Sequence, residues 1–128
     1  QIYKQLDAVE KILQDAKQLR VNTPSSEDYD PIPDGPFICG QEPCFADAGL
    51  FPTWVFFERI LPRYFGWKDV FSGRPLTQTW FEAMCADTCG ERILLEIRKG
   101  LDDWHENGRW DTTGVNDAVK DGNYTWKY

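Results

Sequence analysis

The chain has 128 residues, the usual size of one domain, and 41% of them are hydrophobic, so one core is expected and global disorder is excluded. Its 14 Lys and Arg residues against 21 Asp and Glu give a net charge of −7, which opposes binding to nucleic acids or anionic membranes. The longest dense apolar stretch, Leu50 to Phe57, is far too short to span a bilayer, so no transmembrane helix is expected.

The first twenty residues have the pattern of an amphipathic helix. Apolar positions recur at alternating steps of four and three residues, and polar residues fill the positions between them, so the helix is expected to bury one stripe. These apolar positions are Ile2, Leu6, Val9, Leu13 and Ala16. The next segment, residues 22–36, is rich in Asn, Ser, Asp, Gly and Pro, and it predicts a surface loop.

A buried helix from Phe45 to about Arg59 is the expected centre of the domain. Its residues are apolar on nearly all sides, which is typical of a helix enclosed by others. The tetrad from Cys44 to Asp47 has the spacing of a capping box, in which a carboxylate at the third helical position reaches back to the main-chain N–H of the cap residue. This spacing predicts that the helix begins immediately after Cys44.

Two further helices are predicted in the second half of the chain. Pro75 opens the first of them, at a position where its missing N–H costs little. The residues expected to face inward from this helix are Leu76, Trp80, Phe81 and Met84. Thr88 and Glu91 have the spacing of a second capping box, and they predict a helix that runs to about Glu106.

Two glycines mark the later part of this pattern. Gly100 lies within the predicted helix and costs it about 1 kcal/mol relative to Ala, so it indicates a close helix crossing. Gly108 is expected to supply a left-handed stop.

No alternating run is long enough for a strand, so the predicted fold is all-α, a bundle of five or six helices around a buried central helix. Residues 1–115 are predicted to form this domain and residues 116–128 a C-terminal tail.

Four cysteines are the first residues to weigh for a metal site. Four residues separate Cys39 from Cys44, and three separate Cys85 from Cys89, spacings that a zinc site tolerates but that are not diagnostic. Free thiols are the simpler interpretation, so no metal site is predicted. Free thiols also indicate a soluble protein of a reducing intracellular compartment.

No catalytic or cofactor-binding residue is predicted in this chain. His105, the single histidine, lies in the last turn of a predicted helix, where an imidazole meets the helix dipole favourably, so a capping role is preferred over catalysis. Cys89 falls in the first turn of the same helix, where backbone donors lower the pKa of a thiol, and a reactive thiol at Cys89 is kept as an alternative. No Gly-rich loop joins a strand to a helix, so no phosphate site is expected.

The run of residues 36–52 resembles the start of the central helix in the C-terminal domain of cytosolic glutathione transferases. That family shows a Phe-Leu-x-Gly stretch, a Thr or Ser cap, and then Ala-Asp and an apolar helix. The positions that fit are Ala46, Asp47, Leu50 and Pro52. The cap position holds Cys44, a weaker acceptor than Thr or Ser. The likeness extends over roughly residues 1–115.

The resemblance implies the all-helical fold of that domain. In the family, an N-terminal thioredoxin-like domain binds and activates glutathione, so glutathione is implied here only if such a domain lies upstream. The preferred hypothesis is therefore a non-catalytic structural or interaction module, an accessory subunit that binds protein partners in a larger assembly. The alternative is the C-terminal part of an active glutathione transferase. Similarity to algal members favours the plastid stroma over the cytosol or the mitochondrial matrix.

Overall fold

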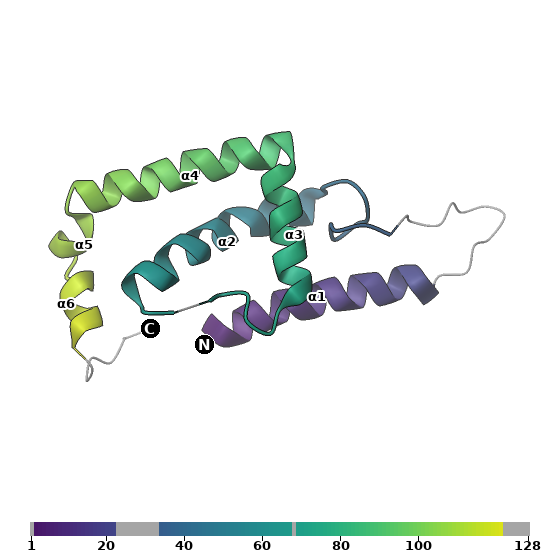
Figure 1. The fold of residues 1–128 in the computed structure, drawn as a ribbon, viewed down its shortest axis with the longest axis horizontal. Helices are drawn as coiled ribbons and strands as arrows, with labels where there is room; N and C mark the ends of the chain where they lie inside the picture. The colour runs from purple at the N-terminus through teal and green to yellow at the C-terminus, as the bar shows by residue number, and fades with distance from the viewer. Residues whose placement is uncertain (1, 23–33, 68, 122–128) are drawn as a thin grey trace.

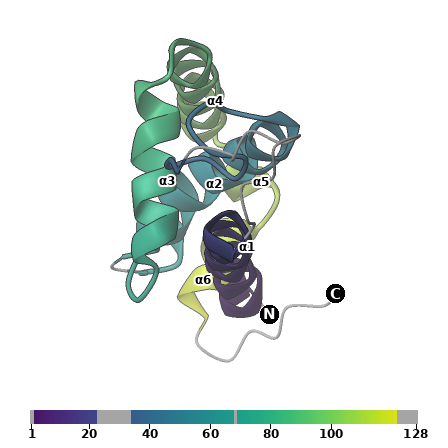
Figure 2. The ribbon, with the colours of Figure 1, turned by 90° about the vertical axis from the view of Figure 1, so that its right-hand side faces the viewer.

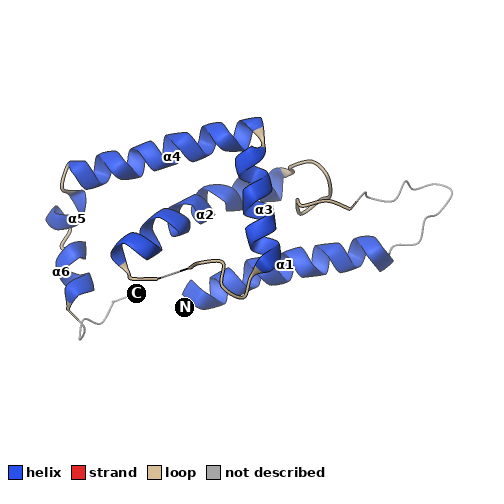
Figure 3. Cartoon of the chain, in the orientation of Figure 1, coloured by secondary structure: helices blue, strands red, loops and turns tan. Residues whose placement is uncertain are grey.

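The computed structural model describes residues 2–22, 34–67 and 69–121, and within them it has six α-helices and no strand (Figure 3). The helices are α1 (Ile2–Asn22), α2 (Phe45–Tyr64), α3 (Pro75–Ala86), α4 (Thr88–Glu106), α5 (Arg109–Thr112) and α6 (Val115–Lys120). The all-α prediction is confirmed. The predicted loop at residues 22–36 falls mainly outside the described residues. No helix in the described part is long and apolar enough to cross a membrane.

The core lies where the first four helices meet. Helix α2 runs between α1 and α4, and α3 crosses these helices on one side (Figures 1 and 2). The largest completely enclosed apolar side chains come from three of these helices and are Leu6, Phe51, Trp54, Val55 and Trp80. The rings of Trp54 and Trp80 meet edge to face with centroids 6.3 Å apart, an arrangement that aromatic pairs prefer. Burial of these side chains holds α2 at the centre.

Helix α2 begins at Phe45, as predicted, but ends later than predicted. It continues past Arg59 to Tyr64, through Pro62, and Phe65 follows as its C-cap. In its first turn Asp47 is fully buried, but Phe45 is 97% exposed and Ala46 is also exposed. The expectation of a helix enclosed on nearly all sides therefore fails for the first turn. From Phe51 onward most side chains are buried or half-buried, but Thr53, Pro62 and Arg63 are exposed.

The predicted capping box of Thr88 and Glu91 is corrected by the structure. Asp87 is the N-cap of α4, and Thr88 is the first helical residue. The Asp87 Oδ1 atom accepts the main-chain N–H groups of Cys89, at 2.9 Å, and Gly90, at 3.0 Å. Asp caps a helix at least as well as Thr, and its negative charge also suits the positive end of the helix dipole.

The close approach predicted at Gly100 is found at Gly90 instead. A Cβ atom added to Gly100 would meet nothing within 4 Å, whereas one added to Gly90 would overlap the main-chain oxygen of Met84. Asp87 alone separates α3 from α4, so the first turn of α4 lies against the last turn of α3.

Gly108 has a φ of +66°, as predicted for a left-handed stop. Helix α6 spans the predicted domain boundary at residue 115, and the tail beyond residue 121 lies outside the described residues.

Candidate functional site

The carboxylate of Asp47 joins the start of α2 to the preceding turn and to α3. Its side chain is fully buried, and Oδ2 accepts the main-chain N–H of Cys44 at 2.8 Å. Oδ1 accepts the main-chain N–H of Ile38 at 3.0 Å and the indole N–H of Trp80 at 2.7 Å. Burial alone would raise the pKa of Asp47, but hydrogen bonds from Cys44, Ile38 and Trp80 outweigh it and hold that pKa below its usual value.

Cys44 occupies the N-cap position of α2. Its backbone is extended, with φ of −118° and ψ of −179°, and its side chain is half-buried. The capping box predicted for Cys44 and Asp47 is present, because the Asp47 carboxylate reaches back to the Cys44 N–H. A hydrogen bond from the Cys44 side chain also helps to lower the pKa of Asp47.

A second buried carboxylate, Glu10, accepts hydrogen bonds from the start of α3. The sequence analysis did not predict this role. Glu10 is 7% exposed, and its Oε2 accepts both the main-chain N–H and the hydroxyl of Thr77, at 2.8 and 2.7 Å. Its Oε1 accepts the N–H of Leu76 at 3.2 Å. One signal was present in the sequence, because Glu10 lies four residues after Leu6 and three before Leu13, within the apolar stripe.

An ion pair reinforces the same junction between α1 and α3. The N-cap residue of α3, Arg74, makes no capping hydrogen bond with its own side chain. Its guanidinium instead donates from Nε and Nη2 to Asp7 Oδ1, at 2.9 and 2.6 Å, and from Nη1 to the carbonyl of Val70. Arg74 is only 7% exposed, so the structure uses it to hold helices together.

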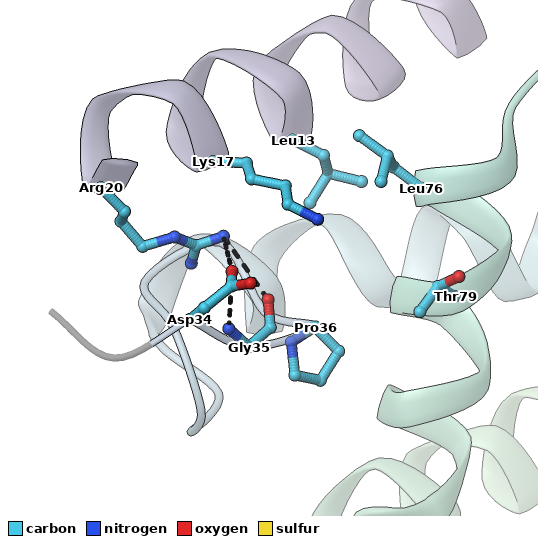
Figure 4. Close-up of a pocket in the computed structure, with 8 residues that line it drawn as sticks. All are labelled: Leu13, Lys17, Arg20, Asp34, Gly35, Pro36, Leu76 and Thr79. Atoms are coloured by element: carbon cyan, nitrogen blue, oxygen red, sulfur yellow. Dashed lines mark hydrogen bonds and ion pairs between the residues drawn. The ribbon is translucent and has the colours of Figure 1, made fainter. Parts of the chain in front are cut away.

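A cavity of about 290 Å³ opens between α1, the turn at residues 34–36 and α3 (Figure 4). Arg20 lies on one side, and its guanidinium donates to the carbonyls of Phe37, at 2.9 Å, and Gly35, at 3.4 Å, with Asp34 3.8 Å away. Arg20 therefore fixes the turn. Lys17 extends toward the space between α1 and α3 and makes no ion pair among the described residues. The lining also includes Thr79, whose hydroxyl donates to the carbonyl of Pro75.

The four cysteines do not form a metal centre in the described part of the chain. All four are free, with Cys39 and Cys89 exposed and Cys44 and Cys85 half-buried. No group of three or more His, Cys, Asp or Glu side chains is placed to hold a metal ion among the described residues. The zinc alternative that the cysteine spacing left open therefore has no geometric support here.

Cys89 and His105 lie at opposite ends of α4 and cannot act on each other. They are sixteen residues apart on this helix, which places them about 24 Å apart. His105 is exposed in the last turn, and its Nδ1 lies 2.6 Å from the hydroxyl of Tyr64. The main-chain N–H of Cys89 donates to Asp87 Oδ1 at 2.9 Å. A reactive thiol at Cys89 stays a prediction.

The family model described as "Glutathione S-transferase, C-terminal domain" matches residues 1–83 of the 128-residue chain. The matched span contains α1, α2 and most of α3, and thus both buried carboxylates. Helices α4 to α6 lie beyond it, whereas the resemblance seen in the sequence extends to about residue 115. No curated protein and no solved structure matches the chain.

Proposed function

The chain belongs to the family of glutathione S-transferase C-terminal domains, and from this premise we propose that it is a non-catalytic structural or interaction module, an accessory subunit of a larger protein assembly. The carrying observation is that the buried polar side chains hold helices together. Hydrogen bonds to neighbouring helices and turns are formed by the side chains of Asp47, Glu10 and Arg74. The single histidine, His105, and the exposed thiol of Cys89 lie at opposite ends of α4.

An apolar groove between α1 and α2 supports the interaction role. The groove has a volume of about 330 Å³, and its apolar lining includes Ala8, Val9, Ile12, Leu50 and Phe57. Ile12 is 44% exposed at its rim, and Phe57 is only partly buried. Exposed apolar surface that forms a groove is typical of a site that binds another protein. The net charge of −7 favours a partner surface that is neutral or basic at its edges.

The test compares two exposed apolar side chains on different helices. Native fractionation of the source cells is expected to recover the protein in an assembly larger than a monomer. We expect Ile12→Asp, in the groove, to weaken that assembly at least tenfold, whereas Leu95→Asp, on α4 and 61% exposed, leaves it intact. Circular dichroism checks that both variants fold. A monomer in the native fraction, or equal loss of assembly in both variants, contradicts the proposal.

Family membership itself favours a second candidate, the C-terminal part of an active glutathione transferase. In that case the groove between α1 and α2 would face a hydrophobic substrate or a further helix of the same protein. Intact mass of the protein isolated from its source separates the two functions. A mass that includes a thioredoxin-like domain, together with turnover of an electrophile by glutathione, supports this candidate and overturns the accessory role.

We also propose a reducing compartment as the site of action, with the plastid stroma preferred over the cytosol or the mitochondrial matrix. Four free cysteines, two of them exposed, support a reducing environment. Immunodetection in purified organelle fractions tests this placement, and signal confined to the secretory pathway contradicts it.

A further inference from the structure

One cysteine lies within the sharp turn that precedes α2 and another lies at the start of that helix. Cys39 is exposed within the turn, and Cys44 is half-buried at the N-cap of the helix. Neither is bonded to another cysteine. Their role in the domain is not explained by the packing of the core, because neither belongs to it.

Main-chain hydrogen bonds bring the two cysteines together. Phe37 and Gly40 each donate an N–H to the carbonyl of the other, at 3.0 and 3.1 Å, and Gly40 adopts a φ of +124° that favours glycine. The two oxygens of Asp47 then hold the N–H groups of Ile38 and Cys44. One carboxylate accepts N–H groups from both segments, so Cys39, which follows Ile38, lies near Cys44. A side-chain hydrogen bond with Cys44 is the main cause that raises the pKa of the Cys39 thiol.

We propose that Cys39 and Cys44 are a redox-active dithiol that closes to an intramolecular disulfide by exchange with a low-molecular-weight disulfide. The thiolate of exposed Cys39 attacks one sulfur of that disulfide and expels the first small thiolate, forming a mixed disulfide. The Cys44 thiolate then attacks the Cys39 sulfur and expels the second. The two protons of the protein thiols end on the two released small thiols, so the small disulfide is reduced as the protein pair is oxidised.

The groups that face Cys39 set the pH dependence of this exchange. The hydrogen bond with Cys44, partial burial and the negative charge of Asp47 raise the pKa of Cys39, and the cation of Arg20 opposes them. The thiolate fraction is therefore small near neutral pH. The exchange rate is expected to rise about tenfold for each pH unit until the pH reaches that pKa.

The other two cysteines provide an internal control. Cys85 lies near the end of α3, where burial raises the pKa of its thiol and where Arg98 and Glu58 are close by. Cys89 lies in the first turn of α4, with its N–H held by Asp87. No contact between these two thiols is seen in the described part of the chain, so they are expected to stay separate when Cys39 and Cys44 join.

The disulfide would tie the turn covalently to the start of α2. Asp47 already holds both segments, so the bond adds a cross-link where the folded chain has little freedom and removes freedom from the unfolded chain. The oxidised protein is therefore expected to unfold at a higher temperature than the reduced protein. This consequence holds whether or not the chain has a protein partner.

The experiment treats the full chain with excess oxidised glutathione and reads the products by mass spectrometry. We expect the loss of two hydrogen atoms, a peptide link between Cys39 and Cys44, and alkylation only at Cys85 and Cys89. Cys44→Ser should retain glutathione on Cys39, and Cys39→Ser should form no internal disulfide. Cys89→Ser should behave as wild type. Dithiothreitol should reverse the change in mass and the rise in unfolding temperature.

Three results would overturn the proposal. They are a persistent mixed disulfide at Cys39 in the wild-type protein, an internal link to Cys85 or Cys89 in its place, and an exchange rate that does not change with pH. Circular dichroism of the two serine variants checks that they keep the fold. A variant that did not fold would be replaced by Cys→Ala at the same position, which keeps the wild-type chain as the primary test.

Discussion

Helices α2 and α3 both begin on a buried carboxylate, but the two carboxylates come from different parts of the chain. Asp47 belongs to the first turn of the helix that it caps, and it accepts the N–H of Cys44 three residues before it. Glu10 belongs to α1, and it accepts the N–H of Thr77 from a helix 67 residues further along. The unpaired N–H groups at the start of each helix are thus met by a local group in one case and by a remote group in the other.

The difference teaches how the helices depend on one another. The start of α2 can be capped as soon as that helix forms. The start of α3 acquires its carboxylate only when α1 is docked, and the ion pair between Asp7 and Arg74 forms at the same junction. Because Asp47 also accepts the indole N–H of Trp80, α3 is joined to α1 by one carboxylate and to α2 by the other. The hydrogen bonds that hold α3 to its carboxylate acceptors are therefore complete only in the assembled domain.

The largest expected effect is that of Asp47→Ala. It leaves three donors without an acceptor, the N–H groups of Cys44 and Ile38 and the indole of Trp80. We expect it to lower the free energy of unfolding by about 3 to 5 kcal/mol, and Asp47→Asn by about half as much, because an amide oxygen still accepts two of the donors. Urea denaturation measures both. A loss under about 1 kcal/mol for the Ala variant would show that Asp47 does not hold this junction.

The contribution of the Asp47 charge to stability can be tested by measuring the free energy of unfolding at acidic pH. The pKa of Asp47 in the folded protein lies below 3.8, so the unfolded chain binds the proton more readily. Its stabilisation is present above that value and is lost as the pH falls through the lower pKa of the folded state. The difference in unfolding free energy between wild type and Asp47→Asn should therefore shrink below about pH 4. A difference that stays constant as the protein is acidified would contradict this.

Glu10→Ala comes next and tests the remote cap. It removes the acceptor for three donors of α3, and because Glu10 is slightly exposed, water can replace part of the loss. We expect about 2 to 3 kcal/mol from urea denaturation, and a coupling energy of about 1 kcal/mol in a double-mutant cycle of Glu10→Gln with Thr77→Val. The matched control is Asp15→Ala on the same helix, whose exposed pair with Lys11 should contribute less than about 0.5 kcal/mol. Equal effects at both positions would remove the distinction between the buried and the exposed carboxylate.

A pair of tryptophans separates packing from hydrogen bonding at the junction of α2 and α3. Trp80 donates its indole N–H to Asp47, whereas the buried N–H of Trp54 has no acceptor among the described residues. Both side chains are almost fully enclosed, so replacement by Phe removes a similar volume from each. We expect Trp80→Phe to destabilise the protein by about 1 to 2 kcal/mol more than Trp54→Phe. Thermal unfolding of both variants measures it, and the reverse order would argue against the bond to Asp47.

These contrasts also mark what the sequence could predict. Asp47 was identified because its partner, the N–H of Cys44, lies three residues away, within a spacing that a sequence pattern records. Glu10 was missed because its partners lie on α3, and only the folded arrangement shows why a carboxylate stands within the apolar stripe of α1. The helices themselves were predictable from apolar periodicity. The proximity of Cys39 and Cys44 was not, because it depends on the turn at Gly40 and on the two N–H groups that Asp47 accepts.

The smallest expected effect is at the start of α4, which supplies an exposed reference for the two buried caps. Asp87 accepts two main-chain N–H groups there, but water reaches this cap, so Asp87→Ala should cost about 1 kcal/mol rather than the several expected for Asp47. Thr88→Ala should change the free energy of unfolding by less than about 0.5 kcal/mol, because Thr88 is already inside the helix, where Ala is the better helix former. Urea denaturation of the two variants decides between these caps. A larger loss at Thr88 than at Asp87 would return the cap to the position that the sequence pattern first indicated.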